Sequence, residues 1–244
     1  MSDCQVMILT RWNIGADIRT RPGMRGVRDM AEWSARRREI MLRMTAPSLF
    51  AQTDADFTWI ILADPQSDPE YSPYQGGPRI AVEPCRGLGP GNTDDFGDVA
   101  AAIARHRTAD RVLTCRLDSD DAVHRQYVGR MRWLARLAEP GHVVLFTRGY
   151  EIDLATGRTC EYPPDVAERR PLAFYGLLEA GERIAGAFAT GRHTTVLDRF
   201  PSVVEPWHGW LRGLHGGNVS RAGLHRRRPA RIDLAQYGLE SAHA

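Results

Sequence analysis

Short apolar runs alternate with segments of helical spacing over the first 140 residues, and this alternation constrains the fold more than any other feature. Apolar side chains recur every three or four positions in the helical segments, whereas the strand-like runs are continuous and rich in β-branched residues. The expected strands are 5–10, 57–63 and 111–117, with a shorter one at 79–82. The expected helices are 29–44, 94–103 and 123–137. This order predicts an α/β fold with a mostly parallel sheet, whose ligands bind beyond the carboxyl ends of the strands.

The pattern changes after residue 140. Segments 142–153 and 158–162 flank a turn at 155–157, which predicts an antiparallel hairpin and an α+β second half. A chain of 244 residues with 43% hydrophobic content suits a single domain, 1–244, with halves 1–122 and 123–244.

Targeting and redox signals are weak. The chain has no apolar stretch of about eighteen residues and no basic segment followed by an apolar core, so we expect a cytoplasmic protein with no transmembrane segment. Cys4, Cys85, Cys115 and Cys160 show no C-x-x-C spacing, which predicts buried thiols rather than a zinc site or disulfides.

The basic residues are unusual in kind. All 32 are arginine, for which genomic base composition is the simplest explanation, and they nearly balance 30 acidic residues. The arginine runs 36–38 and 226–228 could bind phosphates or could lie on solvated surfaces. The near balance argues against a broad nucleic-acid-binding face, and no oligomeric state is indicated.

Three carboxylates follow the strand at 111–117. Asp118, Asp120 and Asp121 would repel one another unless a cation were present, and hard oxygen ligands suit Mg²⁺ or Mn²⁺. The alternative is a solvated turn in which Asp120 or Asp121 caps a helix that begins near Ala122.

Several segments resemble known enzymes. RLDSDDA (116–122) is similar to the D-x-D segment of GT-A glycosyltransferases. Together with LTRWNI, PSL-x-x-Q-T, FTWIILAD and WLRGLHGGNVS, in this order, it resembles the bacterial family described as putative rhamnosyltransferases. The resemblance implies a GT-A fold, with nucleotide-sugar binding in 1–122 and acceptor binding in 123–244. It also implies transfer of a hexose from a nucleotide-diphosphate sugar, of UDP-glucose or dTDP-rhamnose type, to an acceptor hydroxyl.

Residue roles follow from this resemblance. The end of the first strand would hold the nucleotide, and Asp64 would accept a hydrogen bond from the base or would simply start a turn. Arg116, Arg221 or one of 226–228 would face the diphosphate. The residues expected to contact the nucleotide sugar are Thr10, Arg11, Asn13, Asp64, Arg116, Asp118, Ser119 and Asn218. The expected ligands of Mn²⁺ or Mg²⁺ are Asp118, Asp120, Asp121 and His215.

An inverting transfer requires a base for the acceptor hydroxyl. Glu205 precedes Pro206 at an expected helix start, where similar enzymes place an acid, although Pro206 stands where a second acid is usual. The alternative is that Glu205 only stabilises the helix dipole. The substitute bases are Asp198, Asp153 and His208.

The acceptor side is less defined. Trp207, Trp210, Phe188 and Tyr175, with His193, could line an acceptor site or fill the core. The acceptor would be a small soluble metabolite such as a nucleoside, or a saccharide. Two other functions remain open: a sugar-phosphate nucleotidyltransferase, disfavoured by the single glycine in TRWNIG, and a non-enzymatic nucleotide- or nucleic-acid-binding protein.

Overall fold

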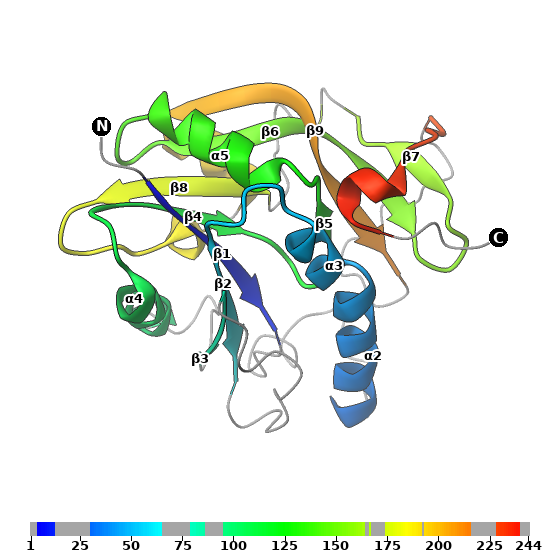
Figure 1. The fold of residues 1–244 in the computed structure, drawn as a ribbon, viewed down its shortest axis with the longest axis horizontal. Helices are drawn as coiled ribbons and strands as arrows, with labels where there is room; N and C mark the ends of the chain where they lie inside the picture. The colour runs from blue at the N-terminus through cyan, green and yellow to red at the C-terminus, as the bar shows by residue number, and fades with distance from the viewer. Residues whose placement is uncertain are drawn as a thin grey trace.

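The computed structural model describes residues 4–12, 30–64, 79–85, 95–163, 166, 174–191, 193–215 and 228–239. Within these ranges the strands form one sheet with the order β3-β2-β1-β4-β8-β6-β9-β5, and β7 pairs with β6 (Figure 1).

The first half of the sheet is parallel, as the alternation predicted. Its strands are β1 (Gln5–Arg11), β2 (Thr58–Ala63), β3 (Ile80–Pro84) and β4 (Arg111–Arg116), and β1 pairs with both β2 and β4. Their carboxyl ends therefore lie along one edge of the sheet. This arrangement confirms the mostly parallel sheet expected for the first half.

Helices cover both faces of these strands. Side chains of β1 alternate, so that Met7 and Leu9 pack toward α4 (Asp95–His106), while Val6 and Ile8 pack toward α5 (Tyr127–Arg136). Such near-continuous apolar strands are typical of a sheet buried on both sides. Two further helices, α2 (Met30–Arg43) and α3 (Thr45–Phe50), follow β1 in the chain. α3 packs beside β5, with Ala46 and Leu49 in the same core cluster as Val6 and Ile8, and α2 extends away from it (Figure 1).

The second half mixes strand directions, as expected for an α+β unit. The strands here are β5 (Ala122–Val123), β6 (Val143–Asp153), β7 (Thr159–Glu161), β8 (Tyr175–Ala180) and β9 (Ser202–Leu214). The predicted hairpin is confirmed as β6 and β7, whose turn has Gly157 at a φ of 70°. β9 runs parallel to β6 over its whole length and bends over α5 (Figure 1). The short helical segments η2 (Ala187–Thr190), η3 (His193–Thr195) and α7 (Val196–Arg199) lie between β8 and β9, and η5 (Leu234–Tyr237) follows β9.

Two expected helix starts are wrong. Ala122 and Val123 form β5 against β9, so α5 begins only at Tyr127. No helix begins at Pro206, which lies inside β9. The register between β6 and β9 shifts there, with Phe146 opposite Glu205 but Arg148 opposite His208. A proline lacks the N–H that a regular ladder needs, and a β-bulge accommodates it.

The helix at 29–44 also differs in its end. The sequence predicted that Pro47 stops the helical pattern, but α3 begins at Thr45 and contains Pro47 in its first turn, where a missing N–H costs little.

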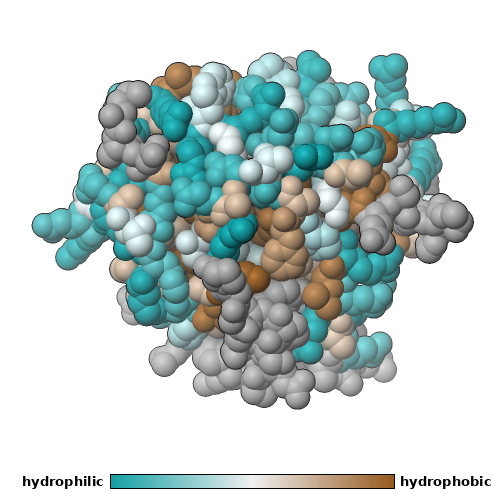
Figure 2. Space-filling view, in the orientation of Figure 1, coloured by the Kyte–Doolittle hydropathy of each residue, from teal (hydrophilic) through white to brown (hydrophobic). Residues whose placement is uncertain are grey.

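All four cysteines are buried thiols, as predicted. Among the described helices, none is long and apolar enough to cross a bilayer. The face shown in Figure 2 is mostly hydrophilic, with apolar residues in small groups.

Candidate functional site

The carboxyl edge of the parallel strands brings two arginines and the acidic segment together. Arg116 lies opposite Leu9 in the register of β1 and β4, and the N–H of Leu117 continues the ladder by donating to the carbonyl of Leu9. This pairing carries Arg11 to the start of the acidic segment, where its Nη2 donates to Asp118 Oδ1 at 3.4 Å. Arg116 Nη2 lies 3.7 Å from the same oxygen.

One aromatic ring supports both guanidinium groups. Arg11 and Arg116 lie over the ring of Phe188, in η2, at 5.4 and 5.0 Å from its centroid. Burial alone would raise the pKa of Asp118, but Arg116 and Arg11 outweigh it and hold the pKa below its usual range. Burial, reinforced by Arg116, lowers the pKa of His193 to about 4, so His193 is neutral near this pair at pH 7.

Asp120 lies deeper and faces a third arginine. Arg37, on α2, donates from Nη1 to Asp120 Oδ2 at 2.8 Å and from Nη2 to Ser119 Oγ at 2.5 Å. His215 Nε2 lies 3.0 Å from the same Asp120 oxygen. Burial would raise the pKa of Asp120, but the charge of Arg37 and the hydrogen bonds of His215 and Arg37 keep it well below its usual value.

Asp121 points toward the backbone of β9. Its Oδ1 accepts a hydrogen bond from the N–H of Gly213 at 3.0 Å, and Thr45 donates to its carbonyl. A side chain at position 213 would place a Cβ 2.1 Å from the carbonyl oxygen of Asp120, so only glycine fits where β9 meets the acidic segment. Burial, with Asp120 and Asp118 nearby, raises the pKa of Asp121 well above its usual value. Asp121 therefore holds the acidic segment against β9.

The four expected metal ligands do not converge on one point. In the described ranges no group of three or more His, Cys, Asp or Glu side chains is arranged to hold a metal ion. Asp118 turns to the two arginines and Asp121 to Gly213, which leaves Asp120 and His215 in contact. Mg²⁺ and Mn²⁺ in nucleotide sites often take only one or two protein ligands, with water and phosphate completing the shell. Asp120 and His215 fit such a site, although Arg37 now contacts both.

The other expected nucleotide contacts have mixed outcomes. Thr10 is fully buried, and its hydroxyl accepts a hydrogen bond from the indole of Trp59 at 3.0 Å. Ser119 is also fully buried against Arg37. These two side chains support the edge from inside, and their contact with the nucleotide stays a prediction. Asp64 lies half-buried just after β2, where an edge residue was expected. Asn13, Asn218, Arg221, Arg226 and Arg227 lie outside the described residues.

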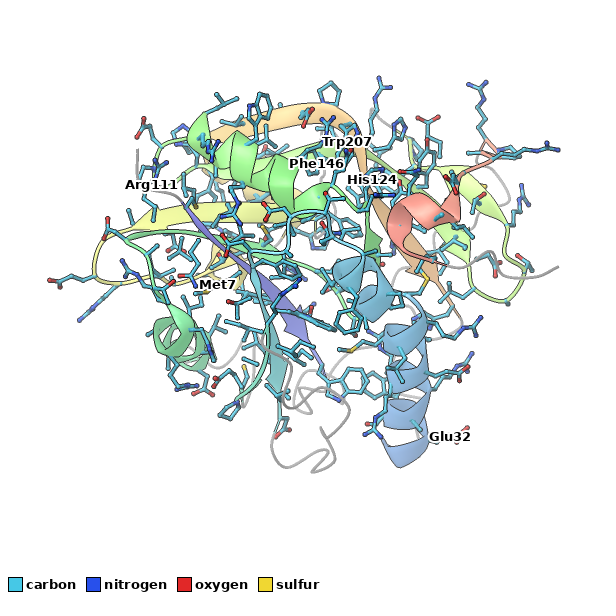
Figure 3. All side chains as sticks on the ribbon, viewed as in Figure 1. Met7, Glu32, Arg111, His124, Phe146 and Trp207 are labelled. Carbon is cyan, nitrogen blue, oxygen red and sulfur yellow. The ribbon has the colours of Figure 1, made fainter. Side chains whose placement is uncertain are left out.

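Glu205 lies in a different environment from the acidic segment. It forms an ion pair with Arg130, on α5, whose guanidinium lies 4.3 Å from the ring centroid of Trp207. Trp207 in turn packs edge-on against His124 and Phe146 (Figure 3). Gly213, which contacts the acidic segment, is eight residues further along β9, a path of about 26 Å at the rise of an extended strand.

The structure also shows where the three alternative candidates for the base lie. Asp153, at the end of β6, accepts hydrogen bonds from the N–H groups of Ala155 and Thr156 in the hairpin turn. His208 stacks on Tyr150 and contacts Glu161 at 3.1 Å. Asp198 is exposed on α7. Of the candidate acceptor aromatics, Trp210 and Tyr175 are buried in the core, Phe188 supports the arginines and Trp207 is half-buried.

Two site residues were missed by the sequence reasoning. Arg37 was read as part of a run that could be solvated, yet it follows Trp33 by one helical turn and occupies the inward face of α2. That spacing could have identified it. Arg212, on β9, pairs at 3.1 Å with the fully buried Glu151 and adds positive charge near Asp121 and His193. A charged pair at matching positions of two strands has no equivalent local signal.

Solved structures with similar folds were found at low identity. Residues 1–349 of TarS from S. aureus, in complex with UDP-GlcNAc, match with a TM-score of 0.48 and 13% identity, covering 90% of this chain and 61% of that one. A "putative nucleotide-diphospho-sugar transferase" from Desulfovibrio desulfuricans G20 matches with a TM-score of 0.37 and 13% identity, covering 93% and 92%. The chain thus spans about three fifths of the TarS fragment. No curated protein sequence is significantly similar to it.

A parallel first half, an acidic segment at its carboxyl edge and a mixed second half are the arrangement expected of a glycosyltransferase of GT-A type. A family model described as "Putative rhamnosyl transferase" matches residues 84–227, more than half of the chain. The chain belongs to this family.

Proposed function

We propose that this chain transfers a hexose from a nucleotide-diphosphate sugar, of UDP-glucose or dTDP-rhamnose type, to an acceptor hydroxyl. The observation that carries the proposal is the pair Arg11 and Arg116, which share the ring of Phe188 beside Asp118 at the ligand-binding edge of the sheet. In a member of this family, that edge is where an activated sugar is expected to bind.

The two arginines suit a diphosphate. A guanidinium presents several N–H donors in a fixed plane and pairs with two phosphate oxygens at once. Phe188 orients both planes before any ligand arrives, so less side-chain entropy is lost on binding. Asp118 contacts the guanidiniums at 3.4 and 3.7 Å, which are long for ion pairs, so phosphate oxygens can compete for the same donors.

The role of Asp118 follows from its position between these arginines and the open edge. It is the most exposed carboxylate of the acidic segment, with 30% of its side chain accessible, and it stays ionised because its pKa is lowered. An ionised carboxylate accepts hydrogen bonds from sugar hydroxyls such as those of a ribose.

A divalent metal is part of the proposal. Asp120 and His215 would hold Mn²⁺ or Mg²⁺, and the ion would neutralise the charge that develops on the departing nucleoside diphosphate. The guanidiniums of Arg11 and Arg116 supply the same kind of stabilisation from the other side of Asp118, as positive charge fixed in a largely buried site.

The transfer is proposed to be inverting, and the base stays a prediction. Glu205 no longer has the helix start that motivated it, and its carboxylate is paired with Arg130. His193 is a further candidate, because it lies near Asp118 and its lowered pKa leaves it unprotonated at neutral pH. The acceptor is proposed to be a small metabolite such as a nucleoside, or a saccharide.

A donor screen tests this function. The full chain is incubated with UDP-glucose, UDP-galactose, GDP-mannose and dTDP-rhamnose, with and without Mn²⁺, and hydrolysis is followed by release of the nucleoside diphosphate. Asp118→Asn should raise the Kd of the hydrolysed donor by roughly 10- to 100-fold, because losing a charged hydrogen bond costs about 1.5–3 kcal/mol. Asp110→Asn, at the exposed start of β4, is the matched control and should bind normally. If no donor binds or is hydrolysed under any condition, the proposal fails.

A further inference from the structure

Arg37 occupies the part of the acidic segment where the metal is expected. It is the middle residue of the run 36–38 and points inward from α2, with 15% of its side chain exposed. Its guanidinium lies 5.8 Å from the ring centroid of Trp33, one turn earlier in the helix. Its neighbour Arg36 is exposed.

A single nitrogen of Arg37 contacts both remaining metal ligands. Nη1 lies 2.8 Å from Asp120 Oδ2 and 3.1 Å from His215 Nε2. Nη1 donates to the carboxylate oxygen, and its contact with Nε2 places the guanidinium against both atoms that a metal ion would bind.

The two ligand atoms are already close enough to share a metal ion. Asp120 Oδ2 and His215 Nε2 are 3.0 Å apart, which is a hydrogen-bond distance. Adjacent ligands of an octahedral ion with bonds of 2.0–2.1 Å are about 2.9 Å apart, so little movement is needed for both to bind one ion. An ion bonded to both atoms, on the side that Arg37 occupies, would lie about 1 Å from Nη1, which is impossible while Arg37 remains.

We propose that Arg37 is the resident cation of the acidic segment and that a divalent metal binds Asp120 and His215 only by displacing it. The inference rests on the metal site of the proposed function and adds a regulation to it. In the metal-free protein, Arg37 balances the buried charge of Asp120, so no carboxylate is left uncompensated. When metal binds, the guanidinium withdraws, and the face of α2 that carries Trp33 and Arg37 changes its packing against the acidic segment.

Metal binding without donor tests the competition directly. Mn²⁺ is titrated into the full chain, and free Mn²⁺ is measured by electron paramagnetic resonance. Arg37→Met removes the charge but keeps an unbranched side chain, and it should lower the Kd for Mn²⁺ at least tenfold. Arg36→Met is the matched control on the same helix and should leave the Kd unchanged. An equal or weaker affinity in Arg37→Met than in the wild type, or no Mn²⁺ binding in either, overturns the proposal.

A second measurement uses the unmodified chain, in case Arg37→Met folds poorly. Saturating Mg²⁺ should increase hydrogen exchange of backbone amides in α2 around Trp33 and Arg37, relative to the metal-free protein. His215→Ala should abolish that increase. Unchanged exchange in the wild type at a Mg²⁺ concentration that binds would contradict displacement. The outcome is independent of the donor screen, because a chain that binds no donor can still exchange Arg37 for a metal.

Discussion

Glu205→Gln is the substitution that most sharply separates a catalytic role from a structural one. The carboxylate of Glu205 is paired with Arg130, and its second oxygen, Oε2, is buried without a hydrogen-bond partner among the described residues. Gln keeps the shape and one acceptor oxygen but removes the charge. Because the carboxylate of Glu205 is already paired with Arg130, and Glu205 lies eight residues before Gly213 along β9, we expect turnover within about threefold of the wild type.

The expected cost is in stability. A hydrogen bond between charged groups contributes about 1.5–3 kcal/mol when buried, but this pair is 38% and 23% exposed, so solvent reduces it to roughly 0.5–1.5 kcal/mol. For a chain of this size, each kcal/mol shifts the melting temperature by about 2–4 °C. We therefore expect a decrease of about 1–6 °C. Arg130→Met should cost more, because it also removes the contact with Trp207.

The assay combines a thermal melt, donor affinity and product formation on Glu205→Gln, Arg130→Met and the double variant. A structural pair predicts that the two single changes are not additive, with a coupling of about 0.5–1 kcal/mol. A general base contributes roughly 10²- to 10⁴-fold in rate. If Glu205→Gln loses turnover by that factor with unchanged melting temperature and donor affinity, Glu205 is the base and the reasoning from strand geometry is wrong.

Three further changes test the packing and the electrostatics. Phe188→Leu should raise the donor Kd several-fold, because Arg11 and Arg116 each lose a contact of about 0.5–1 kcal/mol. A donor Kd that calorimetry finds unchanged would mean that the ring only fills the core. Gly149→Ala places a Cβ 2.1 Å from Trp210 and should cost more than about 2 kcal/mol in urea unfolding, whereas Gly97→Ala, in open space on α4, should be neutral or stabilising. Burial, and then nearby arginines, lower the pKa of His124 from 6.5 to about 4, so the unfolded chain binds a proton more readily than the folded one. The free energy of unfolding should therefore decrease as the pH falls from 6.5 to 4, and His124→Gln should flatten that slope.

The strands of the first half could be predicted because their signal is local. β1, β2 and β4 are continuous apolar runs buried on both faces, and their boundaries differ from the predicted ones by one residue at each end at most. β9 could not be predicted in the same way. Its burial alternates irregularly, Pro206 interrupts its ladder, and its strand conformation depends on pairing with β6 some sixty residues earlier in the chain.

The same contrast between local patterns and tertiary contacts applies to the candidate site. Asp118, Asp120 and Asp121 were predicted because three carboxylates after a strand form a local pattern, but their separate partners were not. Asp120 meets Arg37 across 83 residues and Asp121 meets Gly213 across 92, and such pairings depend on the tertiary fold. Crowded carboxylates need compensation, as the sequence suggested. In the metal-free fold that compensation comes from three arginines, from a backbone N–H and from burial that favours the neutral form of Asp121.

The absence of lysine has a consequence at this site, although base composition suffices to explain it. Arg11 and Arg116 lie over one phenylalanine ring and both reach Asp118, while Arg37 lies near Trp33 and divides its donors between Asp120 and Ser119. Each contact uses the flat guanidinium, which stacks on a ring and donates in several fixed directions. An ammonium is a strongly hydrated point charge that neither stacks in this way nor spans two acceptors at a fixed angle. The geometry at the carboxyl edge of the sheet therefore depends on arginine as such, and a lysine at any of the three positions would keep the charge and lose the orientation.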